Sequence, residues 1–264
     1  MRNGFGQTTT AAVWAAVSGL TMGEAWLRRA EPKSPELLAR YDEVLDQLER
    51  GVPFAYAVGS VGFRMLDLKI DPRALIPRPE TEGLVDLVLA NCATGLVADI
   101  GTGPGCIALS LAVEGRFDKV IAVEQSAAAA SLARENVQRI APQTPVEIRE
   151  GTLLAPLMDK GERFRAIVSN PPYVSAAEYE ELDSSVRDFE PREALVSGVD
   201  GLDATRALFA GAGALLEPGG LLALEIDERR AAAVRSVGRS FGWGVEIYDD
   251  VFGCPRYALS IKED

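Results

Sequence analysis

Residues 96–107 read LVADIGTGPGCI, and this stretch decides the fold class of the chain. The run at 96–100 predicts a buried strand, and the apolar residues at 107–113 predict a helix directly behind the glycines. Glycine lets the backbone turn sharply and approach a ligand without a Cβ in the way, and the first N–H groups of the helix are free to bind that ligand. Doubly wound sheets bind nucleotides at such a loop, although a plain glycine turn is the alternative. The candidate binding residues are Gly101, Thr102, Gly103, Pro104 and Gly105.

Strands and helices alternate from residue 96 onward. Short apolar runs at 96–100, 119–124, 145–149, 164–169 and 221–226 are separated by helical or loop stretches, which is typical of a mostly parallel sheet with helices on both faces. Two further runs, near 244–249 and 256–261, follow each other without a helix between them. We therefore expect an α/β fold whose last strands form an antiparallel edge.

The first 76 residues follow other patterns. Residues 1–52 are expected to form a small helical domain, in which Ser34 and Pro35 begin a helix that Gly51 ends. Residues 53–76 are expected to be a β-hairpin linker, with a first strand near 55–58 and a second strand at 66–70. The α/β domain then covers residues 77–264.

The composition excludes several classes of protein. With 27 Lys and Arg against 39 Asp and Glu, the net charge of −12 disfavours a protein that holds nucleic acid by its phosphates. The chain has no histidine, which excludes Ser-His-Asp triads, Cys-His dyads and imidazole proton shuttles. Its three cysteines are widely spaced and predict neither a metal site nor a disulfide framework. No apolar run is long enough to span a membrane and no secretion signal is visible, so we expect a soluble, cytoplasmic protein.

Glu124 ends the second predicted strand, about twenty residues after the glycine loop. An acidic side chain at this place can accept hydrogen bonds from both ribose hydroxyls, so the pair of features favours an adenosine-containing ligand. A nicotinamide fingerprint needs Gly or Ala where this chain has Cys106. The G-x-G-x-G spacing instead resembles that of S-adenosylmethionine methyltransferases.

The tetrapeptide Asn170, Pro171, Pro172 and Tyr173 follows the apolar strand at 164–169. Two prolines stiffen the chain, so the Asn170 side chain and the Pro171 carbonyl are expected to offer two acceptors at one fixed spot. Such a pair suits a planar –NH2 group, which the Tyr173 ring could flank. A stiff loop with an Asn turn is the alternative.

The chain as a whole resembles the HemK/PrmC family, whose members use S-adenosylmethionine to methylate the glutamine amide in the Gly-Gly-Gln motif of peptide-chain release factors. The resemblance implies a Rossmann-like methyltransferase domain, a release factor as partner, and N-terminal helices that recognise it. Further alternatives are an N-methyltransferase for a small-molecule or peptide amine or for adenine N6 in nucleic acid, and a catalytically silent binding protein. The stretches that carry the resemblance are RGVPFAY (50–56), LIPRPETE (75–82), DIGTGPG (99–105), VSNPPYV (168–174), GVDGL (198–202) and PGG (218–220).

This chain departs from the family pattern at three places. Glu124 replaces the usual Asp at the end of the second strand, a change that keeps the role toward ribose. Thr152 and Leu153 stand where the family has an acidic residue and a larger side chain beside the adenine. Asp227 stands where the family's Glu-Ile-Gly has Gly.

Overall fold

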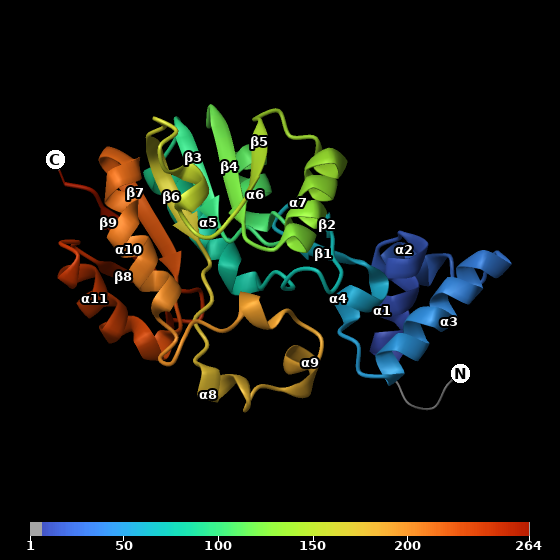
Figure 1. Cartoon of the computed structure of the whole chain (residues 1–264). Helices are drawn as coiled ribbons and strands as arrows, with labels where there is room; N and C mark the ends of the chain where they lie inside the picture. The colour runs from blue at the N-terminus through green and yellow to red at the C-terminus, as the bar shows by residue number, and fades with distance from the viewer. Residues whose placement is uncertain (1–6, 264) are drawn as a thin grey trace.

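The structure, a computed structural model, describes residues 7–263. Within these residues, seven strands form the main sheet in the order β5-β4-β3-β6-β7-β9-β8 (Figure 1). The first five strands of this order pair in parallel, and β9 pairs antiparallel with both β7 and β8. The predicted fold class is therefore confirmed, including the antiparallel edge. The strands are β3 (Leu96–Ile100), β4 (Lys119–Glu124), β5 (Val146–Glu150), β6 (Phe164–Ser169), β7 (Leu216–Glu225), β8 (Glu246–Asp249) and β9 (Pro255–Ile261).

Helices cover both faces of the sheet because neighbouring strand residues point to opposite sides. Val97 packs into a core with α5 and α6, whereas Ala98 packs into a second core with α10 and α11. Both cores are almost fully buried, which explains why the central parallel strands β3, β4 and β6 are mostly apolar, whereas the edge strand β5 is half-buried and alternates apolar with charged residues. The helices of this part are α5 (Glu82–Asn91), α6 (Cys106–Glu114), α7 (Ala127–Ile140), α10 (Asp203–Leu215) and α11 (Ala231–Ser240).

The N-terminal helices stand beside the sheet-containing part of the molecule (blue in Figure 1). Thr21 begins the second of them with a capping box, and the Ser34 hydroxyl caps the third by accepting a hydrogen bond from Leu37 N at 3.2 Å. Val13, Val44, Leu45 and Ala57 form their small core. These helices are α1 (Gln7–Ser18), α2 (Met22–Leu27), α3 (Pro35–Glu49) and α4 (Phe54–Val58).

The expected first hairpin strand near 55–58 is wrong, because these residues form helix α4. Pro53 fixes the backbone where the helix begins, and Gly59 ends it with a left-handed φ of 81°. The hairpin itself exists but lies further along the chain, with β1 (Ser60–Phe63) pairing antiparallel to β2 (Leu66–Lys69). Helix α4 packs with α1 and α3, since Ala57 belongs to the same small core as Val13, Val44 and Leu45. Residues 1–6 and 264 of the expected domains lie outside the described residues.

Shorter elements connect these parts. Over residues 7–263 no helix is both long and apolar enough to cross a membrane. The segment with α8 and α9 extends beyond the sheet on one side (Figure 1). The short helices are η1 (Pro79–Thr81), η2 (Ala155–Leu157), α8 (Ala176–Tyr179), α9 (Ser184–Arg187), η3 (Arg192–Ala194) and η4 (Glu228–Arg230).

Candidate active site

A cavity of about 340 Å³ lies where β3, β4 and β6 end. Parallel strands bring their carboxyl ends to one edge, and Ser169 Oγ ties two of these ends together by donating to the Ile100 carbonyl at 2.6 Å. The cavity thus collects most of the residues singled out from the sequence. Those that line it are Gly101, Gly103, Glu124, Thr152, Leu153, Asn170, Pro171 and Pro172. Thr102, Pro104, Gly105 and Tyr173 are not among the described residues that line it.

The glycine loop forms one wall of the cavity. Gly101 and Gly103 have left-handed φ angles of 73° and 55°. A Cβ at either position would meet no atom of residues 7–263 within 4 Å, so the space in front of both is open. Glycine is therefore required here by the backbone conformation and leaves the loop free for a ligand to approach.

Asp99 and Thr102 hold the glycine loop from behind. The Thr102 hydroxyl donates to Asp99 Oδ2 at 2.6 Å, and Ala108 N donates to the same oxygen at 3.1 Å. Burial raises the pKa of Asp99 to about 7, while these two hydrogen bonds lower it. Asn136 also holds this loop, a role that the sequence did not indicate. Its Nδ2 donates hydrogen bonds to the carbonyls of Pro104 and Lys69.

Glu124 lies at the edge of the cavity in a fixed orientation. Its Oε2 accepts a hydrogen bond from Gly103 N at 2.9 Å, and its Oε1 accepts one from Ser126 N at 2.9 Å. A carboxylate can accept about four hydrogen bonds, so this group can still receive two hydroxyl donors. This is the geometry that a ribose diol needs.

Thr152 and Leu153 follow β5 and form the next wall. Gly151 N donates to the Glu124 carbonyl at 2.9 Å, which carries the chain from β5 back to the end of β4. Leu153 adopts a left-handed φ of 48°, a conformation that costs a non-glycine residue free energy and is concentrated at functional sites. Its half-buried side chain packs against the sheet, whereas Thr152 is exposed. The wall is therefore apolar at Leu153, as a flat aromatic base requires.

Asn170 lies at the end of β6 with a defined amide orientation. Its Nδ2 donates to Thr81 Oγ1 at 3.1 Å, so Oδ1 is at the other end of the amide group and can accept. Pro171 is buried and Pro172 half-buried. The Tyr173 phenol lies next to the carboxyl group of Glu225, and both burial and that group raise the pKa of the phenol.

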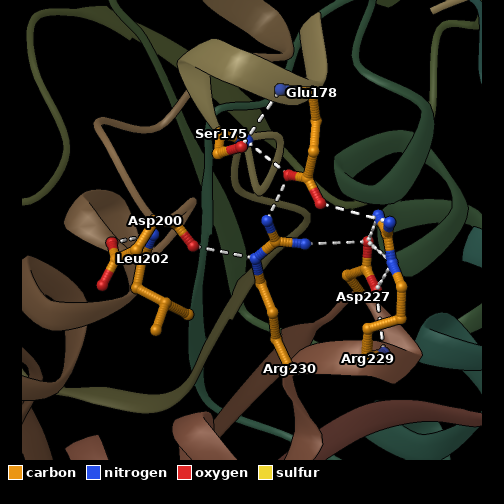
Figure 2. Close-up of polar contacts among 7 residues, drawn as sticks. All are labelled: Ser175, Glu178, Asp200, Leu202, Asp227, Arg229 and Arg230. Atoms are coloured by element: carbon orange, nitrogen blue, oxygen red, sulfur yellow. Dashed lines mark hydrogen bonds and ion pairs between the residues drawn. The ribbon is translucent and has the colours of Figure 1, made fainter. Parts of the chain in front are cut away.

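An ion cluster holds the segment that follows Tyr173 (Figure 2). The Arg230 guanidinium donates to the Asp200 carbonyl at 2.9 Å, to Asp227 Oδ2 at 3.0 Å and to the Glu178 carboxylate. It therefore joins α8, the loop at 198–202 and η4. Asp227 also caps η4 by accepting from Arg229 N at 2.8 Å, which gives this departure from the family pattern a structural role.

Two wall segments of the cavity had no role assigned from the sequence. They are residues 73–75 and several residues between 191 and 204. The buried Glu190 carboxylate joins the two segments, since it pairs with Arg78 at 2.5 Å and accepts from Ile76 N at 3.1 Å. The proline-rich stretch at 75–82 was the available signal for these walls.

Several known proteins similar to this chain are named release factor glutamine methyltransferase. A release factor glutamine methyltransferase from Moorella thermoacetica is 41% identical over 256 residues, which cover 95% of this chain and 89% of that protein. One from Deinococcus radiodurans is 39% identical over 244 residues, covering 91% of this chain and 86% of that protein. The chain belongs to the release factor glutamine methyltransferase family. The resemblance stated from the motifs is thereby confirmed.

Two further comparisons agree with this family. Residues 80–186 match the family described as methyltransferase small domain. A methyltransferase from Pyrococcus furiosus has a similar structure, with a TM-score of 0.56 and 21% sequence identity, covering 86% of this chain and 99% of that one. The latter likeness supports the Rossmann-like methyltransferase fold.

Proposed function

We propose that this chain transfers a methyl group from S-adenosylmethionine to the side-chain amide nitrogen of the glutamine in the Gly-Gly-Gln motif of a peptide-chain release factor. The observation that carries the proposal is the orientation of Asn170. Its Nδ2 donates to Thr81 Oγ1, which leaves Oδ1 as the accepting end of the amide, and both Asn170 and Pro171 line the cavity. The Asn170 Oδ1 and the Pro171 carbonyl match the two hydrogens of a primary amide.

The residues at the cavity fit S-adenosylmethionine, which supplies an electrophilic methyl group on its sulfonium when bound. Glu124 can accept hydrogen bonds from two ribose hydroxyls, because each of its oxygens is already oriented by one backbone N–H. Gly101 and Gly103 leave open space in front of the loop. Leu153 offers an apolar contact for the base.

Asn170 and Pro171 would activate the substrate by position and charge placement. An amide nitrogen is a poor nucleophile because its lone pair is delocalised into the carbonyl, so holding it in line with the methyl group is the main task of the protein. As positive charge develops on the nitrogen, the Asn170 Oδ1 and the Pro171 carbonyl accept stronger hydrogen bonds. This strengthening stabilises the transition state more than the bound substrate. The resulting N-methyl amide cation is acidic enough to lose its proton without a strong base, which is compatible with a chain that has no histidine.

The N-terminal helices are proposed to recognise the release factor. Helix α2 presents large apolar side chains to solvent, with Trp26 62% and Leu27 71% exposed. Arg29 stacks over the Trp26 ring at 4.0 Å, so the patch combines apolar area with positive charge. Exposed apolar side chains gathered on one short helix are typical of a surface for a protein partner. We accordingly assign recognition to residues 1–52, the link to residues 53–76 and catalysis to residues 77–264.

Mass spectrometry of the release factor tests this proposal. Incubation with the full-length chain and S-adenosylmethionine should add one methyl group to the Gly-Gly-Gln peptide of the intact release factor. Asn170→Ala should lower turnover by roughly 10²–10³, the usual loss for one preorganised hydrogen bond at a developing charge. Asn91→Ala is the matched control, because Asn91 is an exposed residue at the end of α5.

Two outcomes would contradict the proposal. The first is a wild-type chain that leaves the release factor unmodified but methylates adenine in nucleic acid or a small amine. The second is a folded Asn170→Ala variant with near-normal turnover on the release factor.

A further inference from the structure

Behind Asn170 lies a buried polar group of three side chains from separate parts of the chain. Thr81 comes from η1, Glu225 from the end of β7, and Tyr173 from the tetrapeptide itself. Thr81 is 2% exposed and Glu225 is 1% exposed, so water cannot serve as a ready partner for either. Thr81 is in direct contact with the site, since its Oγ1 accepts the hydrogen bond from Asn170 Nδ2 at 3.1 Å.

The direction of this hydrogen bond matters for the reaction. The two ends of an asparagine amide have nearly the same shape, but one end donates and the other accepts. A substrate –NH2 group needs an acceptor. If the Asn170 amide were rotated by 180°, its own NH2 group would face the substrate –NH2 group, and neither could accept a hydrogen bond from the other. A threonine hydroxyl alone does not decide the orientation, because it can either donate or accept. The orientation is decided only if a further group accepts a hydrogen bond from the Thr81 hydroxyl, so that its hydrogen points away from Asn170.

Glu225 can accept this hydrogen bond. An ionised carboxylate only accepts hydrogen bonds, so a Thr81 hydroxyl that donates to it presents only lone pairs to Asn170. Burial raises the pKa of this carboxyl group to about 7, and the nearby hydroxyls of Thr81 and Tyr173 lower it. Its Oε2 is buried and finds no hydrogen-bond partner among residues 7–263. A buried carboxyl with an unsatisfied oxygen costs stability, which points to a functional reason for keeping it.

The other charged or titratable groups facing Glu225 come from three elements. Arg256 on β9 favours the ionised form, and Glu80 on η1 disfavours it. Tyr257 on β9 also faces it, and the hydroxyl of this tyrosine donates to the Glu80 carbonyl at 2.5 Å. Cys106 on α6 is the fourth such group. Arg256 makes its ion pair with Asp250, at 3.2 Å.

We propose that Thr81 and Glu225 are positioning residues that hold Asn170 with Oδ1 facing the substrate amide. This inference rests on the proposed function, since it explains how the two acceptors for the glutamine –NH2 group are kept in place. Neither residue touches the substrate. Thr81 acts on Asn170 directly, and Glu225 acts through Thr81.

Variants at Thr81 separate positioning from a merely structural role. Thr81→Val keeps the shape but removes the hydroxyl, and should lower kcat on the release factor roughly 10- to 100-fold through misplacement of Asn170. The dissociation constant for S-adenosylmethionine and the KM for the release factor should change by less than about twofold, because neither contact involves Thr81. Thr81→Ser should restore most of the turnover. Thr205→Val is the matched control, since Thr205 is equally buried but lies on α10.

The pH profile of turnover tests Glu225. A protonated Glu225 can donate to the Thr81 oxygen, which frees the Thr81 hydrogen to turn toward Asn170. We therefore expect kcat of the wild type to rise with pH around 7, and this limb to be absent from Glu225→Gln, whose turnover should be low at every pH. An unchanged limb in Glu225→Gln would overturn the role of Glu225.

A readout that needs no turnover keeps this inference separate from the proposed function. In the ¹⁵N-labelled full chain, the Asn170 side-chain NH2 resonances, identified by their loss in Asn170→Ala, should shift in Thr81→Val and in Glu225→Gln but not in Thr205→Val. If the wild type leaves release factors unmethylated, the proposed function fails, and these resonances still decide the orientation. Unshifted resonances in Thr81→Val would refute the positioning role, as would full turnover of that variant.

Discussion

Replacing Arg78 with alanine should destabilise the fold, because it removes the ion-pair partner of a buried carboxylate. The Arg78 guanidinium pairs with Glu190 Oε1 at 2.5 Å, and the other oxygen of this carboxylate accepts from Ile76 N at 3.1 Å. The Glu190 side chain is 2% exposed, whereas that of Arg78 is 32% exposed. Arg78→Ala would therefore leave a buried carboxylate with a single backbone hydrogen bond.

The size of the effect follows from this burial. Breaking a fully buried ion pair by removing one partner costs about 3–5 kcal/mol. Because a third of the Arg78 side chain is exposed, water can reach the pair, and we discount the loss to roughly 2–3 kcal/mol. In a chain of this length that corresponds to a fall in Tm of roughly 4–12 °C. Glu190→Gln keeps an acceptor for Ile76 N and removes the charge, so it should cost only about 1 kcal/mol.

Thermal unfolding followed by circular dichroism measures these losses. The double variant Arg78→Ala, Glu190→Gln should unfold at a higher temperature than Arg78→Ala alone, because it no longer buries an unpaired charge. Arg235→Ala, at an exposed position on α11, should change the free energy of unfolding by less than about 0.5 kcal/mol. Two results would contradict this expectation. The first is a Tm of Arg78→Ala within about 1 °C of the control. The second is a double variant that unfolds at a lower temperature than Arg78→Ala alone.

Other perturbations should act on separate parts of the molecule. Gly103→Val should abolish S-adenosylmethionine binding in calorimetry, because valine resists the left-handed φ of 55° and fills the open space in front of the loop; retained affinity would contradict this. The pair Trp26→Ala, Leu27→Ala should raise the KM for intact release factor several-fold while leaving cofactor affinity unchanged, and an unaltered KM would remove the recognition role of α2. Burial raises the pKa of Glu225 from 4.5 to about 7, so between these pH values the folded chain holds a proton that the unfolded chain releases, and the free energy of unfolding falls as pH rises. Glu225→Gln should therefore show a flatter dependence of Tm on pH between about 4.5 and 7 than the wild type, and an equally steep one would contradict the shift.

The sheet and half of the site could be predicted because their signals are local. Buried parallel strands are continuous apolar runs, and the glycine loop and the tetrapeptide are contiguous stretches placed at strand ends. The error at 55–58 has a local cause as well, since five residues between Pro53 and Gly59 are too few to show a period.

The missing part of the site depends on contacts between distant residues. Thr81 lies 89 positions before Asn170, and Arg78 lies 112 positions before Glu190. Glu225 follows an apolar run that shows only a strand. Nothing in the pattern around these residues indicates which side chain they meet, because contacts between residues so far apart in the chain depend on how the whole domain packs.

The Arg230 cluster adds ion pairs to the backbone hydrogen bonds and the buried Leu202 side chain that hold the segment after the tetrapeptide. Arg230 and Asp227 are about one-tenth exposed, and Glu178 is 29% exposed, so dissolved ions can reach the cluster from the Glu178 side. Screening by salt weakens such contacts, whereas it leaves apolar cores nearly untouched. The share of the hold on the loop at 198–202 that Arg230 provides therefore weakens as ionic strength rises, whereas the contact of the buried Leu202 side chain with the core beneath the sheet changes little.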